Sequence, residues 1–172
     1  MCVQANKKVA VLMGSDSDFG VMKACVTTLK SFGIEYDVRV ISAHRTPYDA
    51  SEYARCAENG GFGVIIAAAG KAAHLAGVVA AYTTLPVIGV PIKSSTMDGL
   101  DSLLSMVQMP SGIPVATVAI DGAVNAALLA AQILALNDCA LSQKLKEYKS
   151  DLAEQVRRKD TELGFKLEEL LK

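Results

Sequence analysis

The 172-residue chain has little of what several classes of protein depend on. It contains no tryptophan, and its four cysteines, Cys2, Cys25, Cys56 and Cys139, are widely spaced and form no CxxC pair. This spacing excludes a cysteine zinc site and a disulfide framework, and it is typical of free thiols in an intracellular protein. The sequence also lacks a metal-binding cluster of acidic residues and histidines, and a GxSxG serine elbow. We therefore expect neither a bound metal nor serine-hydrolase chemistry.

Charge of either sign is scarce in the middle of the chain. Lys71 is the only charged residue between Gly60 and Ile92, whereas the last 29 residues carry 15 charges out of 17 basic and 18 acidic. Because His74 and Pro86 interrupt the apolar middle, it does not predict a membrane span, and no signal peptide is visible. The net charge of -1 gives no electrostatic reason to bind nucleic acid or an anionic membrane. We expect a cytoplasmic protein.

Short apolar runs alternate with segments of helical periodicity. The expected strands are 9–13, 36–41, 62–68, 85–90 and 115–120, and the expected helices are 16–32, 48–59, 72–82 and 124–136. Continuous apolar runs of this length suit strands that are buried on both faces of a parallel sheet. The pattern predicts an α/β fold, a three-layer α/β/α sandwich with a central parallel, flavodoxin-like sheet and right-handed connections.

The residues beyond Leu136 have a different character. Apolar side chains recur there at helical spacing, with charges on the opposite face: Leu141, Leu145, Tyr148, Leu152, Val156, Leu163, Leu167 and Leu170. This predicts an amphipathic helix, which Gly164 would bend or end. The helix packs either on its own domain or on a neighbouring subunit, and we favour the neighbour because the sandwich is complete at Leu136. We therefore divide the chain into an α/β domain, 1–140, and a C-terminal helical extension, 141–172.

Ligands of open parallel sheets bind beyond the carboxyl ends of the strands. The loop after the first expected strand contributes Gly14, Ser15, Ser17 and Asp18. Serine and aspartate cap helices, and hydroxyls and backbone N–H groups at a helix start also bind phosphate. The spacing alone leaves capping and phosphate binding equally open.

The next two loops carry the only histidines of the chain. After the second expected strand come Ser42, Ala43, His44 and Arg45. His44 can exchange protons near neutral pH and Arg45 can grip a phosphate or carboxylate, so we favour a site over a surface pair. The third loop contributes Ala69, Gly70, Lys71, Ala72, His74 and Leu75. Here the pattern favours a core histidine over a site residue for His74, because it is a lone histidine in an apolar helix. Lys71 is either a site residue or an exposed charge.

The region after the fourth expected strand is rich in turn formers and small polar residues, over 91–95 and 101–114. It forms either a lid or wall of the site or an ordinary connection. Taken together, the loops predict a binder of a small phosphorylated molecule that uses no cofactor and has His44 as its proton carrier.

Five segments in this order resemble the motifs of one enzyme family. They are GSDSD at 14–18, SAHRTP at 42–47, AAHL at 72–75, DSLLSMVQMP at 101–110 and NAALLAAQIL at 125–134. The chain resembles the catalytic subunit of phosphoribosylaminoimidazole carboxylase in its class I form, the N5-carboxyaminoimidazole ribonucleotide mutases of purine biosynthesis. The resemblance covers residues 9–136.

The resemblance implies a role for each loop. The nucleotide and its ribose phosphate would be held by Ser15, Ser17, Asp18, Ser42 and Arg45. His44 would be the general acid/base, and His74 and the Gly70 loop would line the pocket around the carboxylate. The reaction would move a carboxylate from the exocyclic nitrogen to a ring carbon through trapped CO2, without metal or organic cofactor, behind apolar walls such as Ala69 and Leu75.

Two residues depart from the class I pattern: Ala76 stands where class I members usually have proline, and Lys71 is the second. Class I members usually have glycine at the position of Lys71, where class II members, which carboxylate aminoimidazole ribonucleotide directly, usually have a basic residue. The alternatives to the mutase are therefore a class II carboxylase and a non-catalytic nucleotide-binding module. The resemblance also implies a homo-octamer with sites at subunit junctions, and transfer of substrate from the preceding carboxylating enzyme.

Overall fold

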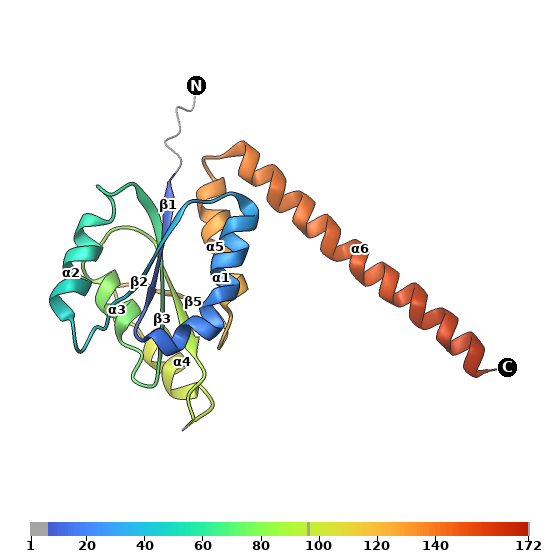
Figure 1. Cartoon of the computed structure of the whole chain (residues 1–172), viewed down its shortest axis with the longest axis horizontal. Coiled ribbons are helices and arrows are strands. Elements are labelled where there is room, and N and C mark those ends of the chain that lie inside the picture. Colours follow the sequence, from blue (N-terminus) through green and yellow to red (C-terminus); the bar gives the residue numbers. More distant parts are fainter. Residues whose placement is uncertain (1–6, 96, 172) are drawn as a thin grey trace.

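The computed structural model describes residues 7–95 and 97–171 and has the predicted three-layer α/β/α architecture (Figure 1). Within these residues the central sheet contains five strands, β1 Lys8–Met13, β2 Tyr36–Val40, β3 Phe62–Gly70, β4 Val87–Ile92 and β5 Ala116–Thr117. Their order is β2-β1-β3-β4-β5, and every pairing is parallel. All carboxyl ends of the strands therefore lie along one edge of the sheet.

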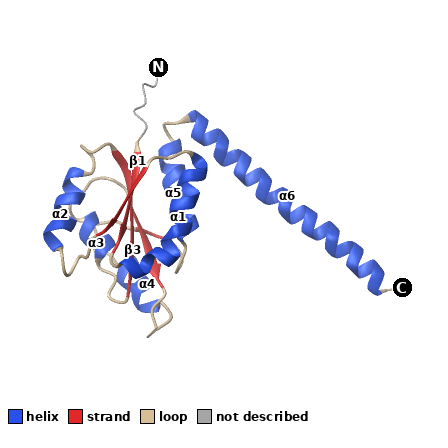
Figure 2. Ribbon diagram, viewed as in Figure 1, coloured by secondary structure: helices blue, strands red, loops and turns tan. Residues whose placement is uncertain are grey.

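Helices cover both faces of the sheet (Figure 2). In chain order they are the short 3-10 helix η1 Asp16–Asp18, then α1 Phe19–Phe32, α2 Pro47–Cys56, α3 Leu75–Ala80, α4 Leu100–Val107, α5 Ala123–Ala135 and α6 Cys139–Leu170. Buried side chains of α1 and α5 form one core with the sheet, and those of α2, α3 and α4 form the other.

Strand β1 shows why its sequence is apolar without interruption. Val9, Val11 and Met13 belong to the core beneath α1 and α5, while Ala10 and Leu12 belong to the opposite core. All five are at most 3% exposed, because successive side chains of a strand point to opposite faces and both faces are covered.

Several boundaries differ from the sequence expectation. Residues 16–18 form a 3-10 turn, α3 begins at Leu75 rather than at position 72, and β5 covers two residues instead of 115–120. Strand β5 pairs with β4 alone, and the chain turns at Asp121, whose φ is 56°. Helix α4 was not among the expected helices, since its surroundings are rich in turn formers.

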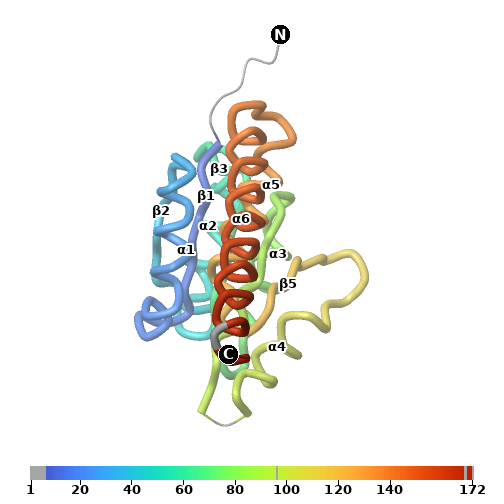
Figure 3. The backbone as a smooth tube through the Cα atoms, turned by 90° about the vertical axis from the view of Figure 1, so that its right-hand side faces the viewer, coloured from blue at the N-terminus to red at the C-terminus, as the bar shows by residue number. Residues whose placement is uncertain are grey.

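Helix α6 is attached to the domain by its first three turns only. Leu141 and Leu145 are buried, the Tyr148 ring packs edge-on against Phe32 at 5.6 Å, and Lys144 Nζ donates a hydrogen bond to the Phe32 carbonyl at 2.9 Å. From position 149 onward every side chain whose burial is described is exposed. Figure 1 shows α6 extending away from the domain, and in Figure 3, turned by 90°, α6 runs in front of the domain.

The predicted end of the helix at Gly164 is wrong, since α6 continues to Leu170, and Figure 1 shows no bend along it. A glycine inside a helix costs only about 1 kcal/mol, which the surrounding helix formers offset. Packing of the exposed part of 141–172 on a neighbouring subunit stays a prediction. None of the described helices has an apolar stretch long enough to cross a membrane.

Candidate active site

Loops at the carboxyl ends of β1, β2, β3 and β4 surround a cavity of about 680 Å³. All of the predicted site residues line it, namely Gly14, Ser15, Ser17, Asp18, Ser42, Ala43, His44, Arg45, Ala69, Gly70, Lys71, Ala72, His74 and Leu75. The lining also includes Ile92, Lys93, Ser94 and Ser95, which follow β4. Their position at the end of a parallel strand was the available signal, although the pattern did not distinguish them from an ordinary connection.

The two histidines of the chain meet in this cavity. His44 lies in the turn between β2 and α2, and His74 is the residue before α3. Nε2 of His44 lies 2.9 Å from Nδ1 of His74, within hydrogen-bond distance, and the rings are nearly perpendicular, with an interplanar angle of 88°. Both side chains are exposed. The interpretation of His74 as a core histidine is therefore wrong. Because the two nitrogens face each other at hydrogen-bond distance, only one proton can lie between them.

The first loop is capped and also lines the cavity, so both interpretations of its sequence apply. The Ser15 hydroxyl accepts a hydrogen bond from the Ser17 backbone N–H at 3.3 Å, and the Ser15 N–H donates to the Asp18 carboxylate at 3.2 Å. This reciprocal capping box fixes the turn that follows β1. The Ser17 hydroxyl, which also lines the cavity, donates a hydrogen bond to the Ser15 hydroxyl at 2.9 Å.

Asp18 is the one acidic residue that lines the cavity, and it is only 6% exposed. Burial raises the pKa of the Asp18 carboxyl above its ordinary value. Hydrogen bonds from Ser15 and Ser17 oppose this rise, and the negative charge of Asp16 adds to it. The Asp18 carboxylate is thus held by hydrogen bonds within its own turn, and it forms no ion pair with the described basic residues of the other loops.

Arg45 connects the first two loops. Its Nη2 donates to the Gly14 carbonyl at 3.3 Å, and its Nε and backbone N–H donate to the Ser42 hydroxyl at 3.4 and 3.2 Å. Thr46 closes the same turn, since its hydroxyl accepts from the Ser42 N–H at 3.0 Å. Because a guanidinium carries five N–H donors, Arg45 retains donors for an anion in the cavity.

The third loop combines close packing with an unusual backbone. Gly70 ends β3 beside its register partner Ile92, the last residue of β4. Lys71 follows with φ 56°, a left-handed conformation that is rare for residues with a side chain. Ala69 and Leu75 are buried and give this side of the cavity an apolar floor.

The described residues contain no group of three His, Cys, Asp or Glu side chains placed to hold a metal ion. What the cavity does contain is a pair of imidazoles, hydroxyl and backbone donors at the start of a turn, and three basic side chains, Arg45, Lys71 and Lys93. This arrangement can bind a molecule with more than one anionic group and move a proton on it.

Comparisons with known proteins agree with this reading. The family described as AIR carboxylase matches residues 8–155. The N5-carboxyaminoimidazole ribonucleotide mutase of Pyrococcus abyssi is 61% identical over 145 residues, which are 84% of this chain and 83% of that protein. The phosphoribosylaminoimidazole carboxylase of Saccharomyces cerevisiae is 53% identical over 148 residues, 86% of this chain and 26% of that protein. The crystal structure of Treponema denticola PurE superposes with a TM-score of 0.82 at 34% identity, covering 91% of this chain and 98% of that one.

Proposed function

Because the chain belongs to the AIR carboxylase family, we propose that it acts in purine biosynthesis and converts N5-carboxyaminoimidazole ribonucleotide to 4-carboxy-5-aminoimidazole ribonucleotide. The observation that carries the proposal is the contact of 2.9 Å between His44 and His74. It puts a proton-transferring pair in a cavity that is otherwise lined by anion-binding and apolar groups. The proposal extends to the roles of individual residues.

The phosphate end of the nucleotide binds near the first two loops. Arg45 offers a bidentate guanidinium, and Ser15 and Ser17 offer hydroxyls at the start of a turn. Ser42 holds Arg45 in place, and the buried Asp18 accepts hydrogen bonds from the turn and from a ribose hydroxyl. The imidazole ring then lies toward the histidines and Gly70.

The reaction is a rearrangement in which His44 carries one proton. The bond between the exocyclic nitrogen and the carboxylate breaks, CO2 is released into the cavity, and the nitrogen takes a proton from His44. The ring carbon then attacks CO2, and its own proton leaves to His44, which restores the starting state. No electrons are gained or lost overall, and His74 supports His44 through the hydrogen bond between their rings.

Retention of CO2 requires a wall that does not bind water. Ala69 and Leu75, each at most 7% exposed, supply such a wall beside the histidines. A carbonyl-rich or charged wall would hold water that competes for the intermediate.

The second candidate is direct carboxylation of aminoimidazole ribonucleotide by CO2. Lys71 at the cavity favours it, because an ammonium can hold an incoming carboxylate or bicarbonate, and one relative is named a carboxylase. A third candidate, a non-catalytic nucleotide-binding module, would have no use for a proton-transferring pair.

Assembly belongs to the same proposal. The exposed part of α6 presents apolar side chains to solvent, including Val156 at 65% exposure and Leu163 at 55%, which a neighbouring subunit would cover. We assign residues 1–140 to the catalytic domain and 141–172 to an extension that joins subunits into a homo-octamer. Operation in the cytoplasm and receipt of substrate from the preceding carboxylating enzyme are parts of this proposal.

The test supplies N5-carboxyaminoimidazole ribonucleotide without bicarbonate and follows formation of the carbon-carboxylated isomer. Isomerisation supports the mutase, and absence of product overturns it. Turnover of aminoimidazole ribonucleotide only with added CO2 would select the carboxylase. In His44→Asn we expect nucleotide binding to persist while turnover falls by several orders of magnitude, because the variant keeps the size of the side chain but transfers no proton.

A further inference from the structure

The basic residues of the cavity are divided between its two ends. Arg45 follows β2, whereas Lys71 and Lys93 follow β3 and β4. Gly70 and Ile92 are register partners, so the two lysines come directly after paired residues of adjacent strands. Neighbouring strands are about 4.8 Å apart, which puts β4 about 14 Å from β2, across β1 and β3. A ligand whose phosphate lies on Arg45 therefore points its other end toward the lysines.

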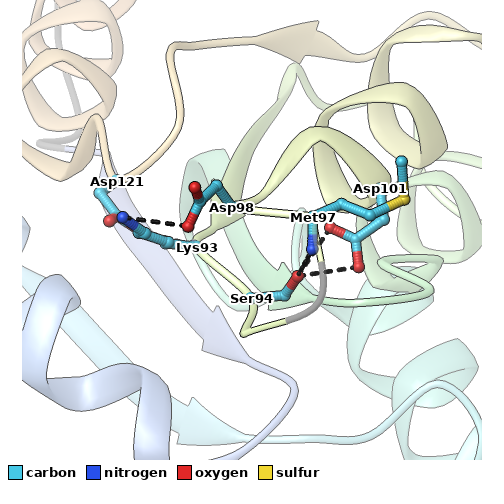
Figure 4. A network of polar contacts seen from close by, with 6 residues as sticks. All are labelled: Lys93, Ser94, Met97, Asp98, Asp101 and Asp121. Carbon is cyan, nitrogen blue, oxygen red and sulfur yellow. Dashed lines mark hydrogen bonds and ion pairs between the residues drawn. The ribbon is translucent and has the colours of Figure 1, made fainter.

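The backbone at Lys93 is held on both sides. Its N–H donates to the Asp121 carboxylate at 2.9 Å, and the Asp121 N–H donates to the Pro91 carbonyl at 2.8 Å. The next residue, Ser94, is buried, and its hydroxyl donates to the Asp101 carboxylate at 2.9 and 3.0 Å (Figure 4). These anchors fix the root of the Lys93 side chain at the cavity and leave the side chain itself free to move.

The Lys93 ammonium has a weakly held partner. Its only ion pair within the described part of the chain is with Asp98, at 3.2 Å, and the two side chains are 60% and 85% exposed (Figure 4). Exposed pairs of this kind contribute little to stability and are screened by salt. Asp98 and Gly99 both have positive φ, 51° and 94°, and this left-handed turn brings Asp98 back beside Lys93. An anion inside the cavity can therefore replace Asp98 at small cost.

We propose that Lys93 recognises the carboxylate of the nucleotide, giving up Asp98 to do so, and thereby distinguishes carboxylated from uncarboxylated nucleotides. This inference rests on the proposed function. An ammonium on a flexible stem suits a carboxylate whose position changes during the reaction, whereas the planar fork of Arg45 suits a phosphate that stays in place. Lys71 adds a second positive charge at the same end of the cavity.

The experiment measures dissociation constants by titration calorimetry for two nucleotides, 4-carboxy-5-aminoimidazole ribonucleotide and uncarboxylated aminoimidazole ribonucleotide. Lys93→Met keeps the length of the side chain without its charge, and Lys23→Met, on the exposed face of α1, is the matched control. We expect Lys93→Met to raise the dissociation constant of the carboxylated nucleotide about tenfold and that of the uncarboxylated nucleotide less than twofold. Asp98→Asn should tighten the carboxylated nucleotide several-fold, and only when Lys93 is present.

Two results would overturn the inference. If Lys93→Met weakens the binding of both nucleotides equally, the ammonium contacts the phosphate or stabilises the fold. If neither affinity changes, Lys93 does not contact the nucleotide. Lys93→Gln, a second uncharged variant, must give the same ratio as Lys93→Met. If the wild-type protein isomerises the substrate while Lys93→Met keeps wild-type selectivity, only this inference fails. If the wild type binds the nucleotides but produces no isomer, only the proposed function fails, and binding of neither nucleotide overturns both.

Discussion

Removal of the His74 imidazole tests whether the histidine pair works as a unit. His74→Leu deletes the nitrogen that lies 2.9 Å from His44 Nε2 and keeps a side chain of similar size. A hydrogen bond to a charged group contributes about 1.5–3 kcal/mol, and because both rings are exposed, water replaces part of it, which leaves about 1–2 kcal/mol. At 1.36 kcal/mol for each factor of ten in rate, kcat should fall about 5- to 30-fold.

The matched variant is His74→Asn, whose amide can put a polar atom near the position of Nδ1. We expect it to recover most of the lost kcat, while the melting temperatures of both variants stay near that of the wild type. The assay follows isomerisation of N5-carboxyaminoimidazole ribonucleotide at saturating substrate, with KM measured in parallel. The reasoning is refuted if His74→Leu has wild-type kcat, or if the leucine and asparagine variants lose kcat equally.

Three further predictions concern stability and assembly. Burial raises the pKa of Asp18, so the native state binds more protons than the unfolded one, and the wild type loses stability as pH rises through the raised pKa. The melting temperature of Asp18→Asn minus that of the wild type should therefore increase from acid to neutral pH. An Asp18→Asn variant that gains nothing over this range would contradict the assignment. Leu145→Ala, at a site 9% exposed, should cost about 2–4 kcal/mol in urea unfolding because it leaves a cavity under α6. Leu163→Ser together with Leu167→Ser, at sites 55% and 50% exposed, should lower the molar mass seen by light scattering; an unchanged mass would exclude this face from assembly.

The sequence predicted the layers and the loops because both depend on local patterns. A strand such as β1, buried on both faces, must be apolar at every position, and the site loops follow from where such strands end. Helix α4 escaped prediction because its polar positions are satisfied by the protein rather than by solvent. The buried Ser102 hydroxyl donates to the carbonyls of Ile92 and Gly99, whereas apolar Leu104 is exposed.

Contacts between loops could not be read from the sequence. His44 and His74 are separated in sequence by a helix and a strand. The distance of 2.9 Å between their ring nitrogens depends on the conformations of the loops after β2 and β3, two strands that have β1 between them. The role of Lys93 had the same obstacle. Its neighbours Asp98 and Asp121 lie outside the five motifs, and both adopt positive φ angles where their carboxylates meet Lys93.

Lys71 allows a test of whether a strained backbone conformation is kept because the lysine side chain is needed for function. A residue with a side chain at φ 56° costs about 1–2 kcal/mol relative to glycine, and the greater freedom of glycine in the unfolded chain returns about 0.4–1 kcal/mol of this. Lys71→Gly should therefore be more stable than the wild type by about 0.5–1 kcal/mol, whereas Lys71→Ala should gain nothing.

The functional half of this prediction uses Lys71→Asn, because asparagine tolerates the left-handed conformation without supplying a charge. If the ammonium holds the carboxylate, the glycine and asparagine variants should both bind 4-carboxy-5-aminoimidazole ribonucleotide more weakly than the wild type, although both are at least as stable. Urea unfolding and titration calorimetry on the same samples decide the matter. A glycine variant that is no more stable than the alanine variant would show that the backbone at position 71 is not strained, and full binding by the asparagine variant would show that the lysine is retained for another reason.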